Sequence, residues 1–159
     1  MPGPPPVKDR PGRGSVIDID AAGRAVETVK RALEYVVAGP PIVHRGPRGE
    51  VSVDVPLMYQ NFALDRVHFD PVLRMPSPKG RPGRAWNVEL SLDEVRGVME
   101  RVLGEVWVVE AAEFREPEDA WAVPLAWRHV IIAHVRVSRD GGEIVPDYGL
   151  TEEVRRRVL

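Results

Sequence analysis

Residues 42–55 read IVHRGPRGEVSVDV, and this stretch decides the fold class. Val51, Val53 and Val55 alternate with polar residues, which is typical of a strand with one buried face. A GPRG turn separates that run from the short IVHR strand, so the pattern predicts an antiparallel hairpin. Residues 57–69 read as a further strand, broken near the Gln-Asn pair that they contain. Strands joined by such tight turns predict a mostly antiparallel sheet.

Two helices accompany this sheet. In residues 20–36, hydrophobic residues recur every three or four positions behind an aspartate N-cap. A second helix is predicted over residues 92–102, because Ser91 and Glu94 form a capping box in front of it. With its flanking strands it gives a β-α-β unit over residues 85–112. We therefore expect an α+β fold: a mostly antiparallel sheet, two main helices packed on one face, one β-α-β unit and a short C-terminal helix.

The 159 residues fit one domain of ordinary size. Residues 1–15 are almost all proline, glycine and charged residues, which predicts a disordered or extended tail. Residues 16–159 are then a single α+β domain. Within it, residues 71–84 (PVLRMPSPKGRPGR) read as a long basic loop, and long loops in compact domains are usually functional or disordered. We find no internal repeat with a period of 20–50 residues.

The composition excludes several classes of protein. The chain has no cysteine, which rules out a disulfide scaffold, a thiolate zinc site and a cysteine nucleophile. Its apolar runs are far shorter than the roughly 18 residues of a membrane span. The MPGPPP start lacks the features of a signal peptide, so we expect a cytoplasmic protein without a membrane partner. Arginine far outnumbers lysine, and Asn and Gln are scarce, as in many thermophile proteins. No motif indicates a metal or another cofactor.

Positive charge is concentrated in the loop at residues 71–84. This loop contains no acid and has a local charge of +4 from Arg74, Lys79, Arg81 and Arg84. Residues 85–120, in contrast, carry a charge of −7. The tetrapeptide RPGR occurs twice, at residues 10–13 and 81–84. Arginines on such a segment can bind the phosphates of a polyanion through two donors at once. The alternative interpretation is a solvated loop in an arginine-rich protein.

A second candidate is a pair of similar strands. Residues 64–70 read LDRVHFD and residues 132–137 read IAHVRV. Alternation along a strand puts Arg66 and His68 on one face of the first, and His134 and Arg136 on one face of the second. If the two strands are neighbours, these four side chains form an anion site or a platform for RNA. The alternative is ordinary polar alternation on the solvent side of an antiparallel sheet.

Two further sets of residues are weaker candidates. Asp65, His68 and Asp70 could bind a metal or act in acid–base catalysis, completed by one of three other histidines, His44, His129 or His134. Alternation separates Asp65 from His68, however, which argues against this site. The four tryptophans, Trp86, Trp107, Trp121 and Trp127, could stack on bases, but packing in the core or in a subunit interface is the simpler interpretation.

The sequence thus favours a non-enzymatic binding protein with RNA, DNA or another polyanion as ligand. Two alternatives remain open. The basic loop of one copy could bind the acidic 85–120 region of a second copy, giving a homo-oligomeric assembly protein. A pocket that contains both His68 and His134 with their neighbouring arginines would instead suggest a small enzyme acting on an anionic substrate.

Overall fold

The computed structural model describes residues 3–8 and 17–158, and the fold is built from helices and short-to-medium strands. In chain order they are α1 (Asp20–Leu33), β1 (Val37–Ala38), β2 (Ile42–Arg45), β3 (Val51–Tyr59), β4 (Phe62–Asp70), β5 (Met75–Pro76), α2 (Leu92–Leu103), β6 (Trp107–Val108), β7 (Glu113–Arg115), the 3₁₀-helix η1 (Glu116–Glu118), β8 (Ala120–Trp127), β9 (Val130–Ser138), β10 (Ile144–Val145) and α3 (Tyr148–Val158). The predicted α+β class is confirmed.

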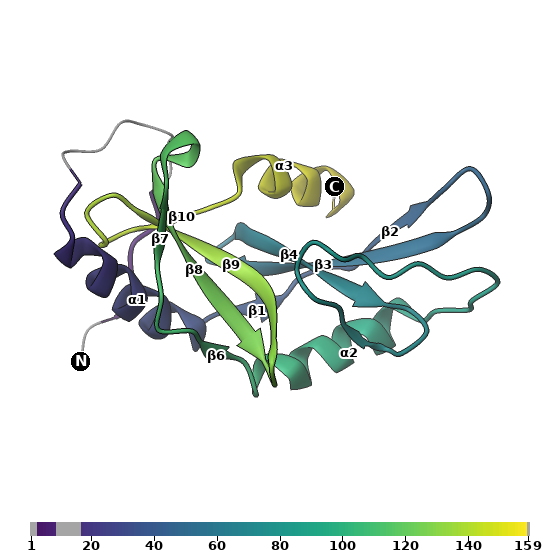
Figure 1. Ribbon diagram of the computed structural model, residues 1–159. Coiled ribbons are helices and arrows are strands. Elements are labelled where there is room, and N and C mark those ends of the chain that lie inside the picture. Colours follow the sequence, from purple (N-terminus) through teal and green to yellow (C-terminus); the bar gives the residue numbers. More distant parts are fainter. Residues whose placement is uncertain (1–2, 9–16, 159) are drawn as a thin grey trace.

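The strands form two antiparallel sheets rather than the one sheet that we expected. The first has the order β1-β3-β4-β5, with β2 also paired to β3. The second has the order β6-β8-β9-β10, with β7 also paired to β8. Figure 1 shows the two sheets side by side, joined where β4 and β9 meet. None of the pairs between these strands is parallel.

The two sheets reveal an internal duplication. The first unit runs from α1 to β5 and the second from α2 to β10, and both consist of one helix followed by five strands in the same order and pairing. Even the irregularities coincide, because β3 shifts register after Leu57 and β8 shifts register after Leu125. The period is longer than the 20–50 residues over which the sequence shows no repeat, so the duplication becomes visible only through the structure.

The sequence retains traces of this duplication. The tripeptide VPL occurs at residues 55–57 in β3 and at residues 123–125 in β8. At the same offset, Arg66 corresponds to His134 and His68 to Arg136. The similar strands noticed in the sequence are therefore the same strand of two equivalent units. The doubled RPGR also precedes each helix at nearly the same distance, although the first copy lies outside the described residues.

Each helix packs on the sheet of the other unit. The buried side of α1, which includes Ala25 and Val29, contacts the second sheet at β6, β8 and β9. The buried side of α2, which includes Val95 and Met99, contacts the first sheet at β1 and β5. Figure 1 shows α1 beneath β8 and β9, and α2 beneath the first sheet. The two units are thus interlocked, and their apolar residues form one continuous core.

The predicted local signals are found with two exceptions, the first of which is the aspartate N-cap: Asp20 is the first residue of α1, and the N-cap is Ile19, whose side chain makes no cap hydrogen bond. Ser91 Oγ accepts a hydrogen bond from the backbone N–H of Glu94, as the capping box requires. The break in residues 57–69 is a two-residue turn, in which Gln60 and Asn61 have the positive φ angles that tight hairpins need. The β-α-β unit over residues 85–112 is not formed, however. Ala85 makes only an isolated antiparallel bridge with Val51, and β6 belongs to the second sheet.

Within residues 3–8 and 17–158, two segments have no counterpart in the other unit. Helix α3 covers part of the first sheet, where Leu150 and Val154 pack on Ile42 and Ala63. Residues 3–8 lie beside β10, where Val7 forms a parallel bridge with Ile144. The tail expected over residues 1–15 is therefore packed on the domain at residues 3–8, and its other residues lie outside the described part of the chain.

Candidate functional site

The Asp65 carboxylate joins the two units at the centre of the molecule. It is buried, and its Oδ1 accepts hydrogen bonds from Lys79 Nζ at 2.7 Å and from the backbone N–H of Arg66 at 2.9 Å. Its Oδ2 accepts the backbone N–H of His134, at 2.8 Å. Because Arg66 and His134 are equivalent residues, one carboxylate binds the same backbone group of both units. Asp65 and Lys79 therefore hold the units together and do not face a ligand.

Symmetry-related backbone bonds flank this carboxylate. The N–H of Lys79 donates to the carbonyl of Ile131, and the N–H of Asp147 donates to the carbonyl of Ala63. These two bonds are equivalent, since Lys79 corresponds to Asp147 and Ala63 to Ile131. The segment after β5 thus bonds to β9 of the second unit, and the segment after β10 bonds to β4 of the first unit. This exchange uses strand edges that would otherwise be open.

Asp54 binds three basic side chains on the outer face of the first sheet. His68 Nδ1 lies 2.7 Å from Asp54 Oδ1, while His44 Nε2 and Arg66 Nη1 each lie 3.2 Å from Asp54 Oδ2. Burial disfavours the charge on Asp54, but the hydrogen bonds and charges of His68 and Arg66 outweigh it and hold the pKa of this carboxyl below its ordinary value. Arg66 and His68 are therefore both bound to a carboxylate within the protein.

Arg136 is also engaged in the second sheet. Its Nε donates to Glu118 Oε1 at 3.2 Å, and its Nη2 lies 3.9 Å from Asp147 Oδ2. His134 lies on the neighbouring outward position of β9. Burial, the positive charge of Arg115 and smaller contributions from Lys79 and Arg136 lower the pKa of His134, against an opposing effect of Asp65. A neutral imidazole beside a paired guanidinium is a weak anion site.

The four-residue stripe does not form as a single surface. Strands β4 and β9 contact each other but belong to different sheets, so Arg66 and His68 do not alternate with His134 and Arg136 on one face. None of the three hollows described below is lined by a histidine. Within the described residues, no group of three or more His, Asp and Glu side chains is placed to hold a metal ion. The arrangement gives no support to a catalytic pocket built on His68 and His134.

The predicted basic loop is divided by the fold. Arg74 pairs with Glu94 on α2, and Lys79 is bound by Asp65. Met75 and Pro76 form β5, so part of the loop is a strand. Only Arg81 and Arg84 stay exposed without an ion pair to any described residue.

Two arginines that the sequence did not single out lie near Arg81 and Arg84, together with Trp86, for which packing in the core or in an interface was the simpler interpretation. Arg45 ends β2 opposite Val51, and Val51 also bridges to Ala85, next to Arg84. Arg48 lies in the β2–β3 turn and Trp86 follows Ala85 with 57% of its surface exposed. We call this set the arginine end; it consists of Arg45, Arg48, Arg81, Arg84 and Trp86. The sequence contained a signal for this set, because the turn at residues 46–49 (GPRG) and the loop at residues 81–84 (RPGR) both consist only of arginine, proline and glycine.

Close packing positions the loop at this end. Gly83 sits against β4, where a Cβ atom would lie 3.0 Å from the Cα of Asp70, so a larger residue would push the loop away. The backbone of Ala85 exchanges two hydrogen bonds with Val51, at 2.8 and 3.0 Å. Ala85 itself is buried, which turns the neighbouring Arg84 and Trp86 outward by strand alternation. The arginine end is thus fixed to the first sheet.

The acidic stretch at residues 85–120 is partly neutralised as well. Glu118 pairs with Arg136 and Arg115, and Asp119 pairs with Arg139. Of the acids between residues 113 and 119, only Glu116 forms no ion pair with a described residue, so less negative charge is left for the basic loop of a second copy. Trp121 and Trp127 are buried as expected, whereas Trp86 and Trp107 are about half exposed.

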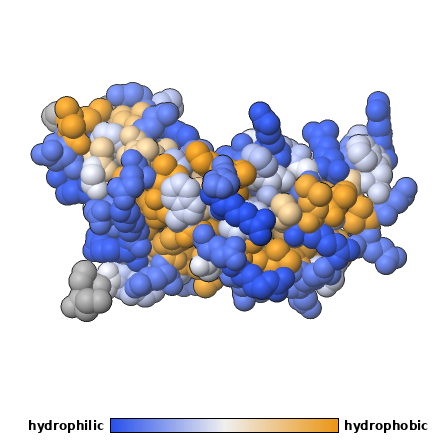
Figure 2. Space-filling model, turned by 60° about the horizontal axis from the view of Figure 1, so that its bottom comes forward, coloured by the Kyte–Doolittle hydropathy of each residue, from blue (hydrophilic) through white to orange (hydrophobic). Residues whose placement is uncertain are grey.

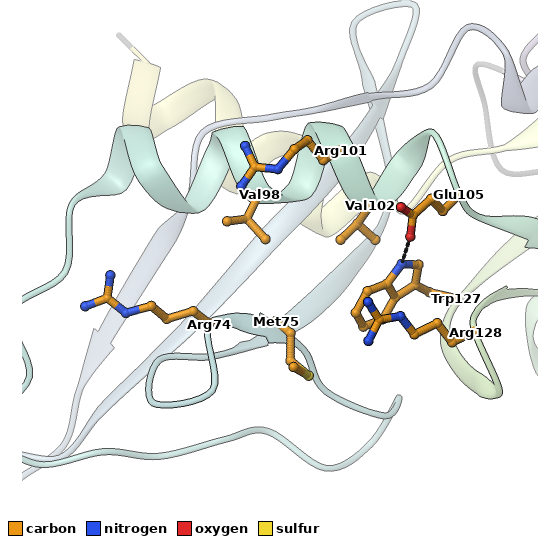
Figure 3. Close-up of a pocket in the computed structure, with 8 residues that line it drawn as sticks. All are labelled: Arg74, Met75, Val98, Arg101, Val102, Glu105, Trp127 and Arg128. Atoms are coloured by element: carbon orange, nitrogen blue, oxygen red, sulfur yellow. Dashed lines mark hydrogen bonds between the residues drawn. The ribbon is translucent and has the colours of Figure 1, made fainter.

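A groove lies between α2, β5 and the β8–β9 turn (Figure 3). It consists of two adjoining hollows of about 270 and 310 Å³ that share Met75, Trp127 and Arg128. The guanidinium of Arg128 lies 4.2 Å from the centre of the Trp127 ring, and Trp127 Nε1 donates to Glu105 Oε1 at 3.0 Å. We call it the Trp127 groove; its lining residues are Asp70, Leu73, Arg74, Met75, Pro76, Ser77, Pro78, Val98, Arg101, Val102, Glu105, Trp127, Arg128 and Val130. A third hollow, of about 420 Å³, lies between α1 and residues 141–142.

Comparison with protein-family models, with curated proteins and with solved structures finds no match to this chain. In residues 17–158, none of the helices has the length and apolar character needed to cross a membrane. Inference about function therefore depends on the chemistry of the two surfaces just described.

Proposed function

We propose that this protein is a non-enzymatic binding protein for polyanions, and that single-stranded nucleic acid binds at the arginine end. The observation that carries the proposal is the combination of four exposed arginines, none ion-paired with a described residue, and the exposed ring of Trp86 on one end of the first sheet. Most of the other predicted cations are already bound to carboxylates.

Both residue types suit that ligand. A guanidinium binds a phosphate through two donors, and each such contact releases counterions from the nucleic acid. An exposed indole can stack on an unpaired base, which contributes about 1–3 kcal/mol per base without regard to sequence. Bases are accessible in single strands and hidden in duplexes, so Trp86 favours a single-stranded ligand.

Fluorescence anisotropy with a labelled 12-nucleotide single strand tests the proposal. With four phosphate contacts, the slope of log K against log salt should be roughly −3, so affinity should fall about 50-fold between 50 and 200 mM salt. The double variant R81A/R84A should lose about half of that slope. The matched control is R156A/R157A, which removes the same charge from exposed residues of α3 and should keep the slope.

The role of Trp86 is tested separately. W86A should weaken single-strand binding by about tenfold or more, as expected for a lost stacking contact, and should change duplex binding little. Absence of binding at 50 mM salt would refute the proposal. Equal effects of R81A/R84A and R156A/R157A would show that overall charge, rather than the arginine end, attracts the polyanion.

A further inference from the structure

The Trp127 groove has an occupied counterpart in the same molecule. Residues 5–8 lie extended beside β10, and the N–H of Ile144 donates to the carbonyl of Pro6 at 2.8 Å. The N–H of Lys8 donates back to the carbonyl of Ile144 at 2.7 Å. Pro5 is buried, and its carbonyl accepts the hydroxyl of Tyr59. The chain's own N-terminal segment is thus joined to the second sheet by an isolated parallel bridge between Val7 and Ile144.

The internal duplication relates that site to the Trp127 groove. At the common offset, Ile144 corresponds to Pro76 and Tyr59 corresponds to Trp127. Both Pro76 and Trp127 line the groove, together with Val130, the counterpart of Phe62. In the Trp127 groove, no described residue occupies the position equivalent to that of residues 5–8. The chain before α2 instead pairs with β3 at Val51. The groove is therefore a vacant site for an extended segment.

The chemistry of the two sites differs in two respects. Pro76 has no N–H, so a segment beside β5 can donate to its carbonyl but gains no hydrogen bond from its nitrogen. Arg101 and Arg128 reach the groove, and neither is ion-paired with a described residue. Glu105, the acid beside them, already binds the indole N–H of Trp127. The open site is thus poorer in backbone bonds and richer in positive charge.

Figure 3 shows Arg101 and Arg128 beside the apolar side chains of Met75, Val98 and Val102, while the Arg74 side chain extends away from them. Figure 2, which brings the lower side of the molecule forward, likewise shows hydrophobic surface directly beside strongly hydrophilic residues. Leu73, at the edge of the groove, is 63% exposed. A ligand for this surface needs both apolar groups and carboxylates.

We propose that the Trp127 groove binds an extended, proline-containing acidic segment of another protein, which runs parallel to β5 as residues 5–8 run parallel to β10. Its prolines lie against Trp127 and Met75, as Pro5 lies at Tyr59. Proline suits this position because it favours the extended conformation and lowers the entropy lost on binding. Carboxylates at the ends of the segment pair with Arg101 and Arg128. This interaction is separate from the polyanion site at the arginine end.

Labelled peptides and the full-length protein test the proposal by fluorescence anisotropy. The parent peptide is GPPPVK, the sequence of residues 3–8, and the acidic probe is EPPPVE. A third peptide, KPPPVK, carries basic ends instead. We expect EPPPVE to bind about tenfold more tightly than KPPPVK, a difference in binding free energy that corresponds to one or two charge contacts. The double variant R101E/R128E should reverse that preference, and M75E should abolish binding of all three peptides.

The duplication supplies a matched control. Arg31 on α1 is the equivalent of Arg101 and is exposed as well, so R31E makes the same charge reversal at the other unit and should leave EPPPVE binding unchanged. Circular dichroism melts of each variant establish that it is folded. The R81A/R84A variant should also bind EPPPVE normally, because the arginine end is a different site.

Four results would overturn the proposal. The first is no anisotropy change with EPPPVE up to millimolar protein. The second is an equal loss of EPPPVE binding in R31E and in R101E/R128E. The third is protein that sediments as a dimer and becomes monomeric in M75E, because the groove would then hold a second copy. Competition of EPPPVE by single-stranded nucleic acid in the R81A/R84A variant would likewise assign the groove to the polyanion.

Discussion

The two units of this protein share one topology but differ at each place where the fold could bind something. The first unit has α3 on its outer face, and no helix of the described residues covers that face of the second. The second unit has residues 3–8 beside β10, and the first has an open groove beside β5. The first unit ends in arginines that have no ion pair with a described residue, whereas the corresponding end of the second contains paired acids. Duplication supplies the scaffold, and later differences between its halves supply the candidate sites.

The centre of the molecule shows the clearest of these differences. Asp65 in the first unit corresponds to Ala133 in the second, so a single carboxylate serves both. A carboxylate in each unit would place two like charges in one buried site, where mutual repulsion would favour protonation of one of them. The asymmetry therefore stabilises the contact between the units.

The largest expected effect follows from removing this carboxylate. D65A removes the carboxylate that accepts from the Lys79 ammonium and from the backbone N–H groups of Arg66 and His134, and leaves Lys79 only the Arg66 carbonyl at 3.5 Å. Breaking a buried ion pair on one side typically costs about 3–5 kcal/mol of unfolding free energy. Urea denaturation measures this loss, and K79M, which leaves the carboxylate its two backbone donors, should cost less.

E94A is the control for this prediction. It removes the exposed pair between Glu94 and Arg74, and surface pairs contribute at most about 1 kcal/mol. If D65A were no more destabilising than E94A, the two units would be held together by apolar packing alone.

The second prediction compares the covered and uncovered outer faces of the sheets. Leu150 is 2% exposed and packs with Val154 on Ala63, so L150A should cost about 2–4 kcal/mol, as buried leucines do. Ile131, the equivalent of Ala63 on the second sheet, is 40% exposed. I131A should therefore cost less than about 1 kcal/mol. Similar losses in urea denaturation would mean that a further segment covers Ile131.

Local features of this fold could be predicted from the sequence. The Ser91–Glu94 capping box, the alternation of Val51, Val53 and Val55, and the turn at Gln60-Asn61 depend on residues close together in the chain. Each of these patterns has one structural solution, which is why the elements and the α+β class followed from them.

The pairing of distant parts could not be predicted in this way. Both helices have one apolar side and both sheets have one apolar face, so periodicity does not say that α1 packs on the second sheet. The same applies to charges, because Lys79 finds Asp65 and Arg136 finds Glu118 only after the strands are placed. The predicted anion site lost most of its members for this reason, and the arginine end gained Arg45 and Arg48.

The smallest expected effect is on the pH dependence of the unfolding free energy. It arises at His134, the residue of the second unit that is equivalent to Arg66. Burial and the charge of Arg115 lower the pKa of His134 in the folded protein, while the unfolded chain has an ordinary histidine pKa near 6.5. Below about pH 6.5 the unfolded chain therefore binds more protons, and stability falls as the pH drops toward the folded pKa. H134Q should reduce this slope, whereas H129Q, at an exposed turn residue, should leave it unchanged.

Urea denaturation of the three proteins at several pH values between 5 and 7.5 measures the slope. Above that range His134 is neutral in both states, so H134Q and the parent should then differ by a constant amount. The restriction to pH 5 and above matters, because the lowered pKa of Asp54 adds stability that is lost only as the pH falls below about 4. A slope equal in H134Q and the parent would mean that His134 protonates freely beside Arg115, Lys79 and Arg136, and that the outer face of the second sheet tolerates a further positive charge. A surface with an added positive charge would bind the acidic groups of a ligand better than cations. The same measurement therefore distinguishes a neutral from an anion-binding surface in the second unit.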